Sequence, residues 1–221
     1  MQKALGLTRM PALAIALALC PIGCGGSSEN SQVKGAICTQ TFAACGGDPT
    51  GTWDIESVCL DGDLVAAYNA NLSQSCANQI TRANLSATGS ATYGVDPVFS
   101  HPTVTYEATT VLQVSETYTP ACALDVYGYA TLDSNTCAQI EETLQNYDQE
   151  KQVTCSFTGT NCACNVTIKH LNTTTDTYAV NGSDITEGDA STYAFCVSGN
   201  TMTQRENFDD KVNVVTRAKM R

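Results

Sequence analysis

The sequence is poor in basic residues and in histidine. It holds 11 Lys and Arg against 22 Asp and Glu, a formal net charge of −11, and it has only 2 His. Nucleic-acid-binding proteins carry basic surfaces, and docking on anionic lipid also needs clustered Lys and Arg. We therefore expect no nucleic-acid partner and no electrostatic attachment to a membrane. A charge far from zero serves solubility.

Signatures of catalysis and of cofactor or metal binding are also lacking. There is no G-x-S-x-G elbow, no glycine-rich phosphate loop and no metal-ligand spacing. The two histidines lie far apart, and the only close cysteine pair, Cys162 and Cys164, lacks the spacing typical of zinc. Asp61 and Asp63 lack the rest of a calcium loop. We expect no catalytic residue, no cofactor and no metal; the protein is not predicted to be an enzyme.

Long apolar runs are absent except at the N-terminus. Lys3 and Arg9 precede an apolar stretch from Met10 to Leu19. This stretch is shorter than the ~20 residues of a membrane span, and its layout is that of a signal peptide. We predict export and removal of residues 1–23. The alternative is a short N-terminal anchor helix that stays in place.

The segment Gly23-Cys24-Gly25-Gly26-Ser27 follows. It resembles the lipobox of bacterial lipoproteins, in which a small residue precedes the acylated cysteine; Pro21 departs from that pattern. The resemblance implies a lipid, palmitate included, on Cys24 and a membrane anchor, with residues 24–37 carrying the lipid and a flexible tether. No Asp follows Cys24, which favours the outer membrane of the cell envelope.

Cysteine is the residue type that the chain has in excess, with 12 in all. Cleavage before Cys24 removes Cys20, and lipidation uses Cys24, so an even number is left for pairing. We predict disulfides and not zinc ligands, in a compartment outside the cytoplasm. The candidates are Cys38, Cys45, Cys59, Cys76, Cys122, Cys137, Cys155, Cys162, Cys164 and Cys196.

Residues 38–221 are predicted to form a single β domain. From Thr103 to Ser115 apolar and polar residues alternate, which is the period of a strand with one buried face. Turn signals at Thr158–Asn161, Asn181–Gly182 and Ser198–Asn200 separate further short strand-like runs. Close turns between short strands indicate an antiparallel barrel or sandwich.

Two segments have helical spacing, Leu64–Ile80, with Asp63 as N-cap, and Thr136–Tyr147, with Thr136 and Gln139 as a capping box. A cysteine on each helix could pin it to the sheet. The pairs considered are Cys59–Cys76, Cys122–Cys137, and Cys155 with either Cys162 or Cys164. Cys162 and Cys164 point the same way on a strand, so they should take different partners.

The segment Gly51-Thr52-Trp53 resembles the G-x-W signature of lipocalins, and the layout with cysteine-rich insertions looks like envelope lipoproteins of myxobacterial type. The resemblance implies a mostly β, antiparallel, disulfide-stapled lipocalin-like barrel with two short inserted helices. It also implies structural roles for Trp53 and for an arginine packed over it, Arg217 or else Arg205. The alternative is a core tryptophan in an unrelated β-sandwich.

A barrel of about eight strands is just wide enough for a small ligand. The first functional hypothesis is a lipid-anchored binding module for a small apolar ligand. The second is a structural or protein-interaction lipoprotein with a filled barrel and an unidentified protein partner. An apolar cavity of about 300 Å3 or more would favour the first.

We predict that Cys24→Ala moves the protein from the membrane fraction to the soluble fraction, because the acyl chains hold it by about 0.8 kcal/mol per buried methylene. Fractionation of cells followed by immunoblotting measures this. Cys20→Ala is the matched control and should stay with the membrane. The opposite behaviour of the two variants would assign the lipid to Cys20.

Overall fold

The computed structural model describes residues 38–39, 41–146, 151–188, 191–209 and 212–221. Within these residues the strands, in chain order, are β1 (Gly51–Asp61), β2 (Ile80–Val95), β3 (Pro102–Tyr118), β4 (Lys151–Phe157), β5 (Cys162–Asn172), β6 (Thr175–Asn181), β7 (Asp184–Glu187), β8 (Thr192–Ser198), β9 (Thr201–Asp209) and β10 (Val212–Met220). The helices are α1 (Leu64–Ala70), the 3-10 turn η1 (Gln74–Cys76), α2 (Pro120–Tyr127) and α3 (Ser134–Asn146).

All strand pairs are antiparallel within one sheet of the described residues, in the order β2-β1-β10-β9-β8-β7-β6-β3-β5-β4. The predicted antiparallel β fold is therefore confirmed. β2 also pairs with β3, so the run from β2 to β3 forms a ring of pairings. Two of these contacts are narrow: β1 meets β2 only from Gly51 to Asp54, and β3 meets β6 only from Thr103 to Thr105.

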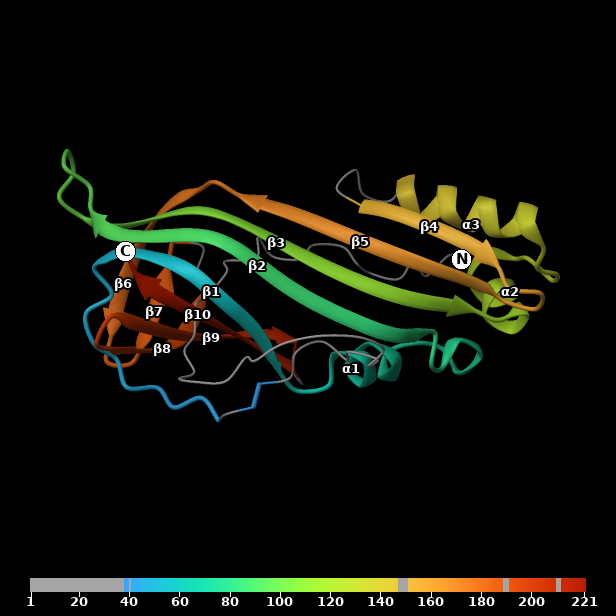
Figure 1. Cartoon of the computed structure of the whole chain (residues 1–221), viewed down its shortest axis with the longest axis horizontal. Coiled ribbons are helices and arrows are strands. Elements are labelled where there is room, and N and C mark those ends of the chain that lie inside the picture. Colours follow the sequence, from blue (N-terminus) through green and yellow to red (C-terminus); the bar gives the residue numbers. More distant parts are fainter. Residues whose placement is uncertain (1–37, 40, 147–150, 189–190, 210–211) are drawn as a thin grey trace.

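The hairpin of β2 and β3 runs the length of the molecule (Figure 1). Its pairing extends without interruption from Arg82 opposite Ser115 to Val95 opposite Pro102. Strands β6 to β10 gather at the end of the hairpin where its turn lies, β4, α2 and α3 lie toward the other end, and β5 runs beside β3 along most of the hairpin (Figure 1). The strand predicted from Thr103 to Ser115 lies within β3.

The buried apolar side chains form three clusters along this hairpin. The first fills the space inside the ring of pairings, around Trp53 and Phe195. The second lies beside it and includes Leu60 and Leu112. The third packs α2 and α3 onto the sheet and contains the half-cystines Cys76, Cys122, Cys137, Cys162 and Cys164. Since β2 and β3 contribute to the first two clusters and Tyr118 of β3 to the third, the hairpin joins all of them.

The predicted helices are partly wrong in extent. Asp63 caps α1 as expected, accepting from the Ala66 N–H at 3.0 Å, but the helix ends at Ala70 and does not reach Ile80. Helix α2, with a proline in its first turn, was not predicted. The capping box at α3 is formed by Asp133 and Thr136, and not by Thr136 and Gln139, because the helix begins at Ser134. Tyr147, the predicted end of α3, lies outside the described residues.

The three predicted turns lie where strands are joined, one of them shifted by a residue. The segment Thr158–Asn161 joins β4 to β5, and Ser198–Asn200 joins β8 to β9. Asn181 is still paired with Asp184, so the turn between β6 and β7 is Gly182–Ser183 and not Asn181–Gly182. Gly182 and Gly199 have φ values of 63° and 59°, a backbone conformation that glycine adopts at little cost.

The ten candidate cysteines form five disulfides, Cys38–Cys59, Cys45–Cys196, Cys76–Cys122, Cys137–Cys162 and Cys155–Cys164. The predicted pairs Cys59–Cys76 and Cys122–Cys137 are wrong, because Cys76 precedes β2 and Cys122 follows β3, and the hairpin brings these two ends together. Cys155 does pair with Cys164 across β4 and β5, and Cys162 takes a different partner. Multiple disulfides are compatible with a protein outside the cytoplasm.

Helix α3 covers the outer edge of β4, the last strand of the sheet. The Val153 N–H donates to the Gln145 side-chain oxygen at 2.9 Å, and the Gln145 amide donates to the Lys151 carbonyl. The Cys155 N–H donates to the Glu141 carboxylate at 2.6 Å. An uncovered edge would offer these groups to another chain, so α3 removes β4 as a site for strand addition.

The disulfides should differ in how much they stabilise the fold. Replacing Cys45 and Cys196 by Ala opens a link across 151 residues, whereas replacing Cys38 and Cys59 opens one across 21. Loop-closure entropy predicts losses of about 4–5 and about 3 kcal/mol, respectively. Urea unfolding under non-reducing conditions measures both. An equal or larger loss for the Cys38/Cys59 variant would show that the Cys45–Cys196 disulfide restricts the unfolded chain no more than the shorter link does.

Candidate functional site

A buried polar cluster lies inside the ring of pairings, among the apolar side chains of the first cluster. Glu187, at the end of β7, is only 5% exposed and accepts a hydrogen bond from the Tyr106 hydroxyl of β3. The Tyr106 and Tyr93 hydroxyls are 3.3 Å apart, and the Gln204 amide of β9 donates to the Tyr93 hydroxyl at 2.7 Å. The Tyr193 hydroxyl of β8 adjoins the same carboxylate.

The environment of this cluster keeps its phenols protonated. Burial raises the pKa of Tyr93, of Tyr106 and of Tyr193 above the ordinary value, and the negative charge of Glu187 raises them further. A phenol in this state donates a hydrogen bond and is a poor nucleophile. The arrangement therefore supplies the buried Glu187 carboxylate with a hydrogen-bond donor from Tyr106.

Buried side chains surround these polar groups. Residues that are at most 1% exposed come from nearly every strand of the ring: Trp53, Tyr93, Val104, Ile185, Tyr193, Phe195, Met202, Gln204 and Ala218. Their burial, together with that of Glu187, describes a packed core centred on polar groups. An apolar ligand inside the ring would have to displace some of these apolar side chains and break the hydrogen bonds of the polar groups.

Trp53 is fully buried, and its indole N–H donates to the Pro49 carbonyl at 2.6 Å. The predicted packing of Arg217 over Trp53 is wrong. Ala218 of β10 points into the core with Trp53, so its neighbour Arg217 points to the opposite face, where its guanidinium pairs with Glu56 at 2.7 Å. Arg205 instead lies over the Phe42 ring, 5.2 Å from its centre.

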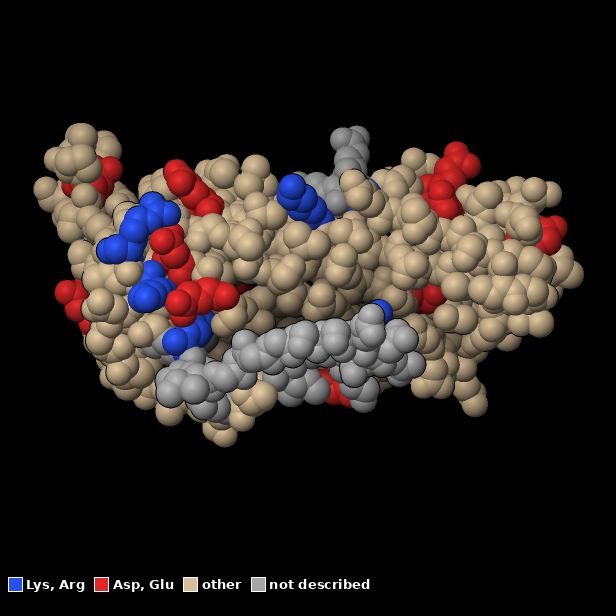
Figure 2. All heavy atoms as spheres, viewed as in Figure 1, with Lys and Arg blue, Asp and Glu red and all other residues tan. Residues whose placement is uncertain are grey.

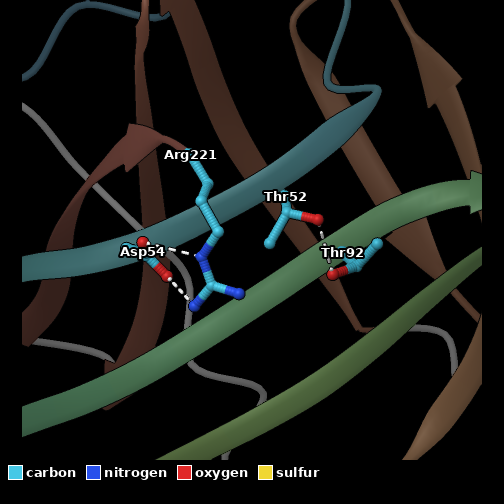
Figure 3. A network of polar contacts seen from close by, with 4 residues as sticks. All are labelled: Thr52, Asp54, Thr92 and Arg221. Carbon is cyan, nitrogen blue, oxygen red and sulfur yellow. Dashed lines mark hydrogen bonds and ion pairs between the residues drawn. The ribbon is translucent and has the colours of Figure 1, made fainter.

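A second polar network lies on the outside, where the C-terminus meets β1 and β2 (Figure 3). The Arg221 guanidinium contacts both Asp54 carboxylate oxygens, at 3.1 and 2.7 Å. The backbone N–H of Arg221 donates to the Thr52 carbonyl. The Thr52 and Thr92 hydroxyls are 3.1 Å apart. Both charged side chains are well exposed, so this ion pair contributes little to stability; its effect is to hold the chain end on β1.

The turn between β2 and β3 is the most exposed apolar feature among the described residues. Val95, Val98 and Phe99 are 63%, 77% and 73% exposed. The Asp96 carboxylate accepts from the Val98 and Phe99 N–H groups at 2.7 and 2.8 Å, and these bonds lower the pKa of Asp96. The Phe99 and His101 rings stack 5.8 Å apart. We call residues 95–101 the hairpin tip.

Neither feature was predicted from the sequence. Glu187 was overlooked because a carboxylate at an inward position looks like a solvated residue, and the tyrosines looked like ordinary core. For the hairpin tip, Val98-Phe99 in an otherwise polar turn was the available sign.

Cys24, the predicted lipidation site, lies outside the described residues, as does all of the predicted signal peptide and tether. In the described ranges, no helix is long and apolar enough to cross a membrane. Nor do three or more His, Cys, Asp or Glu in this part of the chain gather where they could hold a metal ion. His101 lies in the hairpin tip and His170 on β5.

Comparison with known proteins returned no family model, no curated protein and no solved structure that matches this chain.

The buried tyrosines predict instability at alkaline pH. Below about pH 10 a tyrosine is protonated in both the folded and the unfolded chain, so its ionisation takes nothing from the unfolding free energy. Above that pH the unfolded chain ionises first. Each tyrosine with a raised pKa then removes up to about 1.4 kcal/mol of unfolding free energy per pH unit until its folded pKa is reached.

Urea unfolding at pH 9, 10 and 11 should therefore show a steep loss of stability above pH 10. Tyr193→Phe keeps the ring and removes one ionising group, so its stability should fall less steeply with pH. An identical slope for Tyr193→Phe and the parent chain would contradict this account of the core.

Proposed function

We propose that the chain is a lipid-anchored lipoprotein of the cell envelope, acting through contacts of a rigid, filled β domain and not as a carrier of a small apolar ligand. The lipocalin-like ring of strands would close into a small barrel whose interior is occupied by the protein's own side chains. Residues 24–37 would link this barrel to the lipid on Cys24, in the outer membrane.

The observation that carries the proposal is the buried polar cluster. Inside the ring, where a carrier would hold its ligand, Gln204 donates to Tyr93, the Tyr93 and Tyr106 hydroxyls bond each other, and Tyr106 donates to Glu187. An apolar ligand there would break these hydrogen bonds, and each buried polar group left without its partner costs about 1–3 kcal/mol. A ligand would also have to move side chains as large as Trp53 and Phe195.

The first functional hypothesis, a module for a small apolar ligand, is the competing proposal. Native mass spectrometry and organic extraction of the protein purified from its host distinguish the two. A filled domain should release no small molecule apart from its own acyl chains. An apolar molecule recovered in stoichiometric amount would overturn the filled-domain proposal.

Benzene provides a controlled test in solution. If the domain is filled as proposed, the parent chain should show no rise in melting temperature with benzene. Phe195→Ala removes a fully buried ring and should create a dry cavity of the kind that binds benzene, so its melting temperature should rise. A rise for the parent chain equal to that of Phe195→Ala would show that the domain already has an apolar cavity.

A further inference from the structure

The hairpin tip has a fixed conformation although it projects from the domain (Figure 1). Besides accepting the two N–H bonds from Val98 and Phe99 with its carboxylate, Asp96 uses its backbone: its N–H donates to the His101 carbonyl, and its carbonyl accepts from the Ser100 N–H, both at 2.9 Å. These bonds cross the turn in both directions. Val98 and Phe99 are thus held outward in water without the entropy cost of ordering a loose loop on binding.

We infer that the hairpin tip inserts Val98 and Phe99 into the interface of the bilayer that carries the chain's own lipid anchor. The inference rests on the proposed lipid anchoring. Shallow insertion of apolar side chains at the headgroup boundary is a known mode of peripheral membrane contact, and aromatic rings are favoured at that depth.

The area of the tip favours a bilayer over a protein partner. Three exposed side chains offer on the order of 300 Å2 of apolar surface, well below the ~800 Å2 per partner of a stable protein interface. A bilayer needs no such area, because a lipid-anchored chain never leaves it and even a weak second contact becomes effective at close range.

Charge selects the kind of lipid surface. In Figure 2 the projecting tip carries acidic atoms and shows no Lys or Arg. With a formal net charge of −11 on the chain, an anionic surface would repel the domain. The surface that fits is a zwitterionic one, where the apolar side chains supply the attraction.

The length of the tether is compatible with this contact. The described chain begins at Cys38, which is held at the far end of β1 by its N–H bond to the Leu60 carbonyl and by its disulfide to Cys59. From there the strand runs about 30 Å back to Gly51, near the turn end of the hairpin. Residues 24–37 reach up to about 50 Å when extended, so the tip and the anchor can lie in one bilayer.

Tryptophan fluorescence tests the inference, because the single native tryptophan, Trp53, is fully buried and gives a constant background. The lipidated Phe99→Trp chain is reconstituted in phosphatidylcholine vesicles with either ordinary or dibrominated acyl chains. Insertion should blue-shift the added emission and cause at least about a twofold loss in the brominated vesicles. Val98→Trp reports on the same tip and should agree with it.

Leu171→Trp is the matched control, since Leu171 is 60% exposed on β5 and away from the tip. It should keep its emission in brominated vesicles, as should the parent chain. Equal emission in both vesicle types for the two tip variants, or equal quenching of Leu171→Trp, would overturn the inference. In the first case the tip remains in water, which would favour a protein pocket as its partner.

Flotation of the same samples separates this inference from the anchoring proposal. Vesicles that carry the protein to the top of a gradient while the tip variants stay unquenched would refute tip insertion and leave the anchor standing. Protein that remains at the bottom would refute the anchor. In that case an unquenched tip at high lipid concentration refutes insertion as well, and a quenched tip shows that it binds lipid without the anchor.

Discussion

The continuous pairing of β2 with β3 is the constraint on which the rest of the molecule depends. The two strands have 16 and 17 residues, and this one hairpin contributes to the ring core, the second cluster and the disulfide-rich cluster. A slip of one residue would turn every inward side chain outward along its whole length. Gly89 helps to define this pairing, because its φ of 118° suits glycine and an added Cβ would lie 2.1 Å from the Glu107 carbonyl oxygen.

The disulfides attach the helices and the first described residues, which strand pairing alone does not hold in place. Cys76–Cys122 closes the open end of the hairpin by joining the segment before β2 to the helix after β3. Cys137–Cys162 fixes α3, which in turn covers the edge of β4 with Gln145 and Glu141. The bonds of Cys38 and Cys45 attach the first described residues to β1 and β8. Cys38–Cys59, Cys45–Cys196 and Cys137–Cys162 thus each join a flanking segment to a strand that is already placed by pairing.

Local pattern predicted the parts of this fold that depend on local forces. The alternation in β3, the three turns and the Asp63 cap are set by residues close in sequence. Disulfide partners depend instead on which strands become neighbours, and sequence spacing does not contain that information. The same holds for Arg217, whose direction follows from the register of β10 against β1. Glu187 and Gln204 were missed because they occupy inward positions that a binary pattern assigns to apolar residues.

The two ends of the hairpin differ in what they expose to solvent. At the open end, side chains of α3 bond the backbone groups of β4, so another chain cannot extend the sheet at this strand. At the turn end, the Asp96 carboxylate accepts hydrogen bonds from the backbone N–H groups of Val98 and Phe99, while the side chains of these two residues are exposed. Such side chains are costly to expose to water and contribute nothing to the filled core. Burying them against a bilayer would remove this cost, which is why we propose that the turn end makes the contact.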